Sequence, residues 1–332
     1  MQYLTTARDP KQIRRDVRGV VLCVVAFILT LQIVAVLVVM AVAFFENAGS
    51  IAQFAESNSN LAGEMQQDQF LVFFDKAMDE YIGLGMIIGM ICGLCWFFLI
   101  RGKRFVTSDI PRVNSKANFG ILFILLVGIF AIQALMILLY AVFEPLFNQG
   151  GGSLTDTLEE ATTSLAITFW GALYIAVIGP ICEELVFRGA VMRKLERYGS
   201  NFAIIVSSLL FALYHMILFQ AVFAFFIGII FAYAAGRFSL KWAILLHMIN
   251  NGLAVLSTYA NSDVFSGILL LIYGLSLLAT IVVILVRLDL FAAQKIAGSP
   301  SEPRVYPRAF ASPWLIGYLI LTGILSVHVI FA

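Results

Sequence analysis

Charged side chains are scarce in this chain. Only 12% of its 332 residues are Asp, Glu, Lys or Arg, and 61% are hydrophobic. Soluble domains carry about 25% charged residues, so this composition excludes an ordinary soluble protein and indicates one that crosses a membrane several times. The formal net charge is only +1. We therefore expect membrane lipids around the fold and no nucleic-acid partner.

Cysteine is also sparse, and a cleavable signal peptide is not evident. The four cysteines lie within or beside apolar segments, at Cys23, Cys92, Cys95 and Cys182. This placement is typical of small core residues and argues against a disulfide framework. Cys92 and Cys95 have the spacing of a redox or metal pair, which is the weaker interpretation. The first apolar run is too long for a signal sequence, so we expect it to be a retained span.

Long apolar runs dominate the rest of the sequence. A helix needs about 20 apolar residues to cross the hydrocarbon core, and the chain offers about nine candidates. They lie at 19–44, 81–100, 119–143, 164–182, 202–219, 221–236, 242–260, 264–286 and 312–331. Only Gln220 separates the fifth candidate from the sixth. We predict an all-α fold, a polytopic transmembrane helical bundle of about eight or nine spans with an intramembrane polar cavity.

Basic residues in the loops predict the orientation of this bundle. Loops rich in Lys and Arg face the cytoplasm. Basic clusters precede the first candidate span and follow the second, fourth, sixth and eighth, whereas the loop after the first span is acidic. We predict a cytoplasmic amino terminus, and we expect a multi-pass protein of a bacterial or archaeal cell membrane.

The spans divide the chain into four regions. Their predicted bounds are 1–18 for a cytoplasmic basic amino-terminal segment, 19–160 for accessory transmembrane helices with an external loop at 46–80, 161–290 for the candidate chemistry, and 291–332 for a cytoplasmic linker and a terminal transmembrane helix. Within the second span Gly85, Gly89 and Gly93 form a small-residue ridge, which favours close helix packing. No internal repeat is evident, which argues against a transporter built from inverted halves.

Ionisable residues are almost missing from the apolar segments of the second half. Such residues are costly at membrane depth and usually functional. From the third candidate span onward, only the group that begins at Glu183 places acidic or basic side chains in an apolar segment. The polar residues that stand out there are Glu183, Glu184, Arg188, His215, His247, Asn250 and Asn251.

Spacing predicts how the first of these residues are arranged. Glu184 and Arg188 are four residues apart, so they can pair on one helix face, and we assign that pair a mainly structural role. Glu183 is rotated by about 100° from its neighbour. It can therefore point into a cavity that the pair does not reach.

Two further helix faces can complete a polar pocket with Glu183. Phe211 and His215 are four residues apart, as are His247 and Asn251, so each pair shares a face. A carboxylate, two histidines and a carboxamide supply a base for water, an acid for the leaving amine and donors for an oxyanion, which amide hydrolysis needs. The alternative is a metal held by His215, His247 and a glutamate, with one position open for water.

The two histidines would lie at different depths on straight helices. With a rise of 1.5 Å per residue, His215 would lie about 20 Å along its span and His247 only about 8 Å. A tilt, a kink at Pro180 or a break near Gln220 can bring them together, and breaks are tolerated around a protein-lined cavity. We therefore expect an irregular element near residues 216–222.

Each of these residues also has a purely structural interpretation. Glu183 and Glu184 can be interfacial residues, and Asn250 and Asn251 can hydrogen-bond between helices without further function. A lone histidine in a span is more often a packing residue, and we interpret His328 in the last span that way. The functional hypothesis rests on the co-occurrence of the others in an otherwise apolar sequence.

Three motifs in order resemble one known family. They are Glu-Glu-x-x-x-Arg at 183–188, Phe-x-x-x-His at 211–215 and His-x-x-x-Asn at 247–251. They resemble the CPBP (CAAX protease and bacteriocin-processing) family of intramembrane peptidases, also called the Abi or Rce1-like family. The resemblance covers residues 160–260, so that region 161–290 is expected to be a CPBP-like catalytic transmembrane core.

The resemblance implies an intramembrane endopeptidase whose active site opens toward the cytoplasm. It makes Glu183 the water-activating base and His215 its partner. It makes His247 and Asn251 the groups that stabilise the oxyanion. The supporting residues are Glu184, Arg188 and Phe211.

The implied substrate is a hydrophobic or lipid-modified peptide, such as a CAAX-like tail or a bacteriocin-like or signal-peptide-like segment. The family has been described both as glutamate-type and as metal-dependent. We favour a glutamate mechanism without a cofactor, because Asn251 is a better oxyanion donor than a zinc ligand. Zn held by His215, His247 and Glu183 is the alternative.

Two other functions are compatible with the same residues. A non-catalytic membrane immunity or scaffold protein could retain a degenerate site, although complete motifs argue against it. A proton-coupled transporter could use carboxylates and histidines as a relay. It predicts polar groups on both sides of the midplane and a repeated architecture, and the sequence has neither.

Overall fold

The computed structural model describes residues 10–49, 62–154, 165–286 and 305–331. Within these residues every regular element is a helix, apart from an isolated β-bridge between Val113 and Ser239. The helices are α1 (Pro10–Glu46), α3 (Ala62–Gly93), α4 (Cys95–Arg101), η1 (Phe105–Asp109), α5 (Phe119–Gln149), α7 (Phe169–Leu173), η2 (Tyr174–Ile178), α8 (Gly179–Glu184), η3 (Leu185–Met192), α9 (Arg193–Leu195), η4 (Glu196–Tyr198), α10 (Ser200–Tyr214), α11 (Leu218–Arg237), α12 (Leu240–Ala260), α13 (Asp263–Val286), α15 (Val305–Phe310) and α16 (Pro313–Phe331).

In the part of the chain that the structure describes, eight helical stretches are long and apolar enough to cross a membrane. They are Lys11–Glu46, Leu71–Arg101, Phe119–Gln149, Phe169–Tyr198, Leu218–Arg237, Leu240–Ala260, Asp263–Val286 and Pro313–Phe331. The predicted polytopic helical bundle is confirmed, and the protein is an integral membrane protein. The fifth candidate span, at 202–219, differs from its prediction, because helix α10 has only 15 residues.

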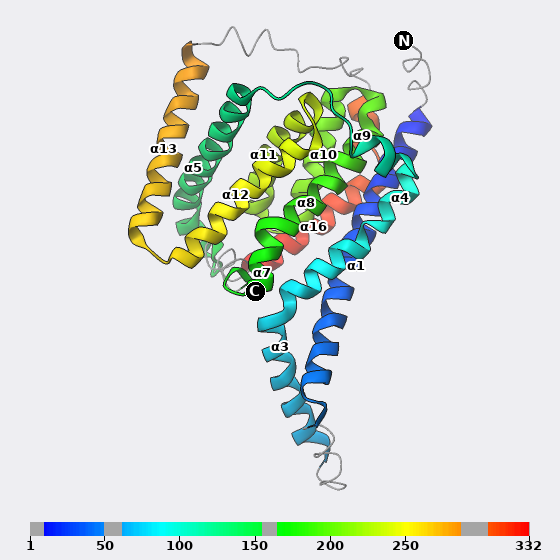
Figure 1. The fold of residues 1–332 in the computed structure, drawn as a ribbon, viewed down its shortest axis with the longest axis vertical. Helices are drawn as coiled ribbons and strands as arrows, with labels where there is room; N and C mark the ends of the chain where they lie inside the picture. Colours follow the sequence, from blue (N-terminus) through cyan, green and yellow to red (C-terminus); the bar gives the residue numbers. More distant parts are fainter. Residues whose placement is uncertain (1–9, 50–61, 155–164, 287–304, 332) are drawn as a thin grey trace.

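The predicted glycine ridge lies at the contact between α1 and α3. A β-carbon on Gly85 would lie 2.7 Å from the carbonyl oxygen of Ala35, and one on Gly89 would lie 2.6 Å from that of Leu31. Glycine at these positions lets the two backbones approach more closely than any side chain would allow. The two helices project together beyond the other helices (Figure 1).

Much of the connection after the first span is helical. We expected an external loop at 46–80, but α3 already begins at Ala62 and runs into the second span without a break. The reason is that residues 62–80 continue the helix on which α1 packs. Residues 50–61 of that loop lie outside the described part of the chain.

Helices α3, α10, α11 and α12 pack against the fourth span, Phe169–Tyr198. Helix α11 packs against α10, α12 and α5, and α12 contacts the fourth span along η2, α8 and η3. Helix α13 packs on α5 at the edge of the bundle (Figure 1), while α16 contacts α1, α10 and α11. The fourth span, α10 and α12 carry the three sequence motifs, and α11 lies between the last two.

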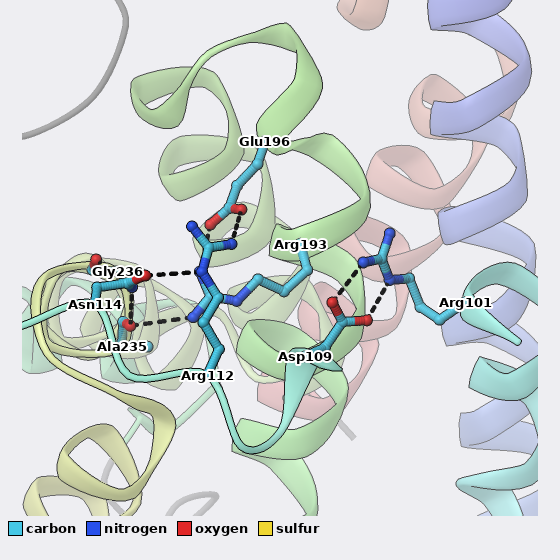
Figure 2. A network of polar contacts seen from close by, with 8 residues as sticks. All are labelled: Arg101, Asp109, Arg112, Asn114, Arg193, Glu196, Ala235 and Gly236. Carbon is cyan, nitrogen blue, oxygen red and sulfur yellow. Dashed lines mark hydrogen bonds and ion pairs between the residues drawn. The ribbon is translucent and has the colours of Figure 1, made fainter. Parts of the chain in front are cut away.

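A polar network joins the connection between α4 and α5 to one end of the bundle (Figure 2). Arg112 on this connection pairs with Glu196 of η4 at 2.7 Å. Glu196 also pairs with Arg193, whose Nη2 donates to the carbonyl oxygen of Ala235 in α11 at 3.2 Å. The network therefore fixes the end of the fourth span relative to the end of α11.

The basic segments that the structure describes gather at this same end. Lys194 and Arg197 each lie 3.4 Å from a carboxylate oxygen of Asp16 in α1. The bridge between Val113 and Ser239 joins the connection before α5 to the start of α12. The basic clusters before the first span and after the second, fourth and sixth candidates thus share one end, as the loop pattern requires.

Candidate active site

Irregular turns of the fourth span place the first motif. Two π-helical stretches, η2 and η3, flank the short helix α8, which carries Glu183 and Glu184. In η2 the backbone N–H of Gly179 bonds to the carbonyl oxygen of Tyr174, five residues earlier. A β-carbon on Gly179 would lie 2.7 Å from that oxygen, so glycine permits the wide turn. Such π turns are frequent at functional sites.

Glu184 connects the first motif to the third. Glu184 and Arg188 are both 0% exposed, and Arg188 Nη1 donates to Glu184 Oε1 at 2.7 Å. The same oxygen lies 3.0 Å from Nδ1 of His247. A carboxylate only accepts, so Nδ1 carries the hydrogen in this contact. Nε2 of His247 lies on the side of Glu183, 3.6 Å from its Oε2.

Arg188 is stabilised from three sides, although it is fully buried. Its Nη2 donates to the carbonyl oxygen of Gly228 in α11 at 3.0 Å. Its guanidinium carbon lies 4.3 Å from the ring centroid of Phe211 and 5.6 Å from that of Phe231. A buried charge needs such compensation. The predicted ion pair with Glu184 is therefore one part of a larger packed cluster.

Phe211 packs against one residue from each of the three motifs. Besides Arg188, its ring contacts His215 edge-on at a centroid distance of 4.9 Å and His247 at 5.7 Å. The Phe211 ring thus contacts both imidazoles, and its supporting role stays a prediction. Phe231 of α11 stacks on the other face of the cluster, 4.6 Å from the His247 ring centroid.

His215 lies where the helical backbone breaks. Helix α10 ends just before it, α11 begins at Leu218, and Met216 between them has a φ of 57°. The carbonyl oxygen of Met216 accepts a hydrogen bond of 2.7 Å from Ser326 Oγ of α16. The irregular element that we expected near 216–222 is present but shorter, because it covers residues 215–217 and residues 218–222 already belong to α11.

The imidazole of His215 is also held through Nδ1. Nδ1 lies 2.9 Å from the carbonyl oxygen of Phe211. Because a carbonyl oxygen only accepts, Nδ1 is the donor and Nε2 remains for other partners. In both His215 and His247, therefore, Nδ1 carries a hydrogen and donates it to a protein oxygen.

The four residues predicted to be catalytic line one pocket of about 420 Å³. They are Glu183, His215, His247 and Asn251. The short α10 and the break after it resolve the depth difference expected for straight helices, since the two histidines meet across Phe211. Most other lining side chains are apolar, and the description of this site as an intramembrane polar cavity stays a prediction.

Glu184 and Arg188 do not line this pocket but lie behind it. Asn251 lies on its wall, with its Nδ2 donating to the carbonyl oxygen of Ile175 in η2 at 3.1 Å. Asn250 beside it is 5% exposed and donates to Oδ1 of Asn251 at 3.0 Å. The third motif thus supplies an imidazole and a carboxamide on one helix face, as the spacing predicts.

This part of the chain matches a protein family. Residues 165–253 match type II CAAX prenyl endopeptidase Rce1-like proteins. The segment is therefore similar to an Rce1-like domain. It contains all three motifs, supports membership of the CPBP family, and supports a membrane-embedded protease of the CAAX type. No curated protein matches the chain, and no solved structure matches it.

The structure also brings side chains to the site that the sequence patterns did not single out. Tyr174 and Tyr214 line the pocket beside Glu183 and His215. Tyr214 directly precedes His215 of the second motif, so its place in the sequence was a usable signal. Phe231 gave no such signal in the sequence, because aromatic residues are common in apolar helices. Gln133 on α5, outside the domain, was detectable as an isolated amide in an apolar span.

The alternative zinc site requires His215, His247 and Glu183 to converge on one ion. Among the residues that the structure describes, no group of three or more His, Cys, Asp or Glu side chains is arranged to hold a metal. His247 Nδ1 is already bound to Glu184, so only its Nε2 could serve as a ligand.

Proposed function

We propose that this protein is a glutamate-type intramembrane endopeptidase that hydrolyses a peptide bond in a hydrophobic or lipid-modified substrate, with CAAX-like tails as the first class to test. One observation carries the proposal. Glu183, His215, His247 and Asn251, from three separate parts of the chain, line one pocket. This set supplies a base, a second proton-accepting nitrogen and an amide donor, which peptide hydrolysis needs.

Glu183 is the base in this proposal. Its carboxylate takes a proton from water, and the water oxygen forms a bond to the carbonyl carbon of the scissile peptide. Nε2 of His215 accepts a hydrogen bond from the other O–H of the water, which keeps that hydrogen and is oriented by the bond; Nε2 is the accepting nitrogen because Nδ1 is bound to Phe211. Glu183 then passes its proton to the leaving nitrogen as the C–N bond breaks, giving a carboxylic acid and an amine.

Asn251 and His247 stabilise the oxyanion of the tetrahedral intermediate. The Nδ2 of Asn251 has two hydrogens and uses one on Ile175, so the other is available to the oxyanion. When His247 is protonated, its Nε2 donates as well. Glu184 stabilises that imidazolium through Nδ1, much as a carboxylate orients a catalytic histidine elsewhere.

The test is cleavage of prenylated and unmodified CAAX-type and other hydrophobic peptides by the full-length protein in proteoliposomes. We compare the wild type with Glu183→Gln and with Glu46→Gln, a control at the end of α1, each with and without a strong chelator. Loss of the base should lower kcat by about 10²- to 10⁴-fold. The control should retain wild-type cleavage.

Each outcome of this experiment decides between named functions. Loss of cleavage in Glu183→Gln alone supports the glutamate mechanism, and loss with chelator in the wild type moves the assignment to a metal-dependent protease. Retained cleavage in Glu183→Gln overturns the assignment of the base. Absence of cleavage by the wild type on every peptide favours the immunity or scaffold role.

A further inference from the structure

A row of side-chain amides crosses the bundle from α5 to the fourth span. Gln133 Nε2 on α5 donates to Asn250 Oδ1 at 3.4 Å. Asn250 Nδ2 donates to Asn251 Oδ1 at 3.0 Å, and Asn251 Nδ2 donates to the carbonyl oxygen of Ile175 at 3.1 Å. The row therefore links three helical elements and ends in the wall of the pocket.

The row has one direction of donation, and this direction fixes the amide of Asn251. Each side-chain oxygen accepts from the preceding residue and each nitrogen donates to the next. Rotating the Asn251 amide by 180° would place its oxygen against the carbonyl oxygen of Ile175. It would also place the Asn251 side-chain nitrogen against Nδ2 of Asn250. Both contacts would then lose their hydrogen bonds, which costs about 1–3 kcal/mol for each buried group left unpaired.

One hydrogen of Asn251 is left over by this count. A carboxamide has two N–H groups and one accepting oxygen. Asn250 occupies the oxygen and Ile175 takes one hydrogen. The second N–H of Asn251 has no partner in this row, and Asn251 lines the same pocket as Glu183. An oxyanion donor must be held in place before the reaction to be effective.

We infer that Gln133 and Asn250 are positioning residues that hold the free N–H of Asn251 toward the scissile carbonyl. The inference rests on the proposed peptidase function. Asn250 is only 5% exposed, so no solvent replaces its bonds. Gln133 lies outside the matched segment 165–253, so the helix packed against the Rce1-like domain contributes to the active site from the accessory region.

The test is a double-mutant cycle of Gln133→Met and Asn251→Ala with cleavage as the readout. Methionine removes the donor while keeping a similar volume. We expect Gln133→Met to lower kcat on the order of 10- to 100-fold, because small misplacement of a reacting group has effects of this size. KM should stay within about twofold. In the Asn251→Ala background the same substitution should have no further effect on kcat.

The matched control is Ser276→Ala, a buried polar residue of α13, the helix that packs on α5. If the kcat loss in Gln133→Met does not come from altered helix packing, Ser276→Ala should leave kcat unchanged. A tenfold or larger loss from Gln133→Met that persists in the Asn251→Ala background overturns the inference, since Gln133 would then act independently of Asn251. A change in KM alone, or no change in kcat, also overturns it.

Failure of the proposed function has a different signature. If the wild type cleaves no peptide, the peptidase proposal fails, and thermal unfolding of the same four proteins of the cycle decides the remaining point. Non-additive shifts of Tm support an amide row that orients Asn251. Additive shifts show that the two residues are not coupled and overturn the row as well.

Discussion

A single carboxylate oxygen, Oε1 of Glu184, serves two of the three motifs. Arg188 binds it from its own motif and His247 from the third. The other oxygen, Oε2, has no hydrogen-bond partner among the described residues. Stability and imidazole orientation therefore depend on the same buried contact. Glu184 and Arg188 thus contact the third motif directly or through this oxygen without lining the pocket.

Removal of Arg188 should be far more damaging than removal of an exposed arginine. Arg188→Met leaves the carboxylate of Glu184 buried without its main counter-charge, which should lower the free energy of unfolding by about 3–5 kcal/mol. Arg112→Met is the control, because Arg112 is 45% exposed in its pair with Glu196 and should contribute under about 1 kcal/mol. The measurement is equilibrium unfolding in mixed micelles. Similar losses in both variants would contradict the buried-pair interpretation.

At the scale of single elements, regular helix geometry explains some features and misses others. The four-residue spacings correctly predicted that Glu184 meets Arg188 and that Phe211 meets His215. The π turns of the fourth span were not predictable from apolar periodicity, because widening one turn leaves the composition unchanged. Gly179 is the visible trace of such a turn, but a glycine in a span is more commonly a packing residue.

The ridge on α3 gives a prediction about the packing of one helix pair. Gly89→Leu would place a β-carbon 2.6 Å from the backbone of α1 at Leu31, so the helices must separate. We expect a loss of about 1–3 kcal/mol in unfolding free energy, as for other overpacked sites. Gly274→Leu on α13 is the control, since a β-carbon there meets no atom within 4 Å. Equal thermal stability of the two variants would rule out close packing by the ridge.

At the scale of the whole molecule, hydropathy predicted most of the architecture. Eight of the nine candidate spans correspond to membrane-length helices, and the candidate at 202–219 is the exception. A run of about 20 apolar residues leaves little alternative to a spanning helix. The convergence of Glu183, His215, His247 and Asn251 followed from the motifs together with the resemblance. Gln133 and Ser326 could not be linked to them, because the contacts between distant helices leave no spacing pattern in one sequence.

The shared basic end predicts the orientation of the molecule in the membrane. Lys103, at the basic end, should face the cytoplasm, and Gly49, after α1, should face outside. In a variant with all four cysteines replaced, Gly49→Cys should react with a membrane-impermeant maleimide in intact cells. Lys103→Cys should react only after the membrane is opened. The reverse labelling pattern would show that the protein is inserted the other way round.

Ser326 lies in the last helix, yet its hydroxyl holds the carbonyl oxygen of Met216, next to His215. Gln133, which precedes the matched segment in the sequence, donates a hydrogen bond to Asn250. The segment that defines the family is therefore not a transplantable unit. A chimera that grafts residues 165–253 into an unrelated bundle would leave these two acceptors without their donors, so an engineered or minimal version of this protein has to retain α5 and α16 as well.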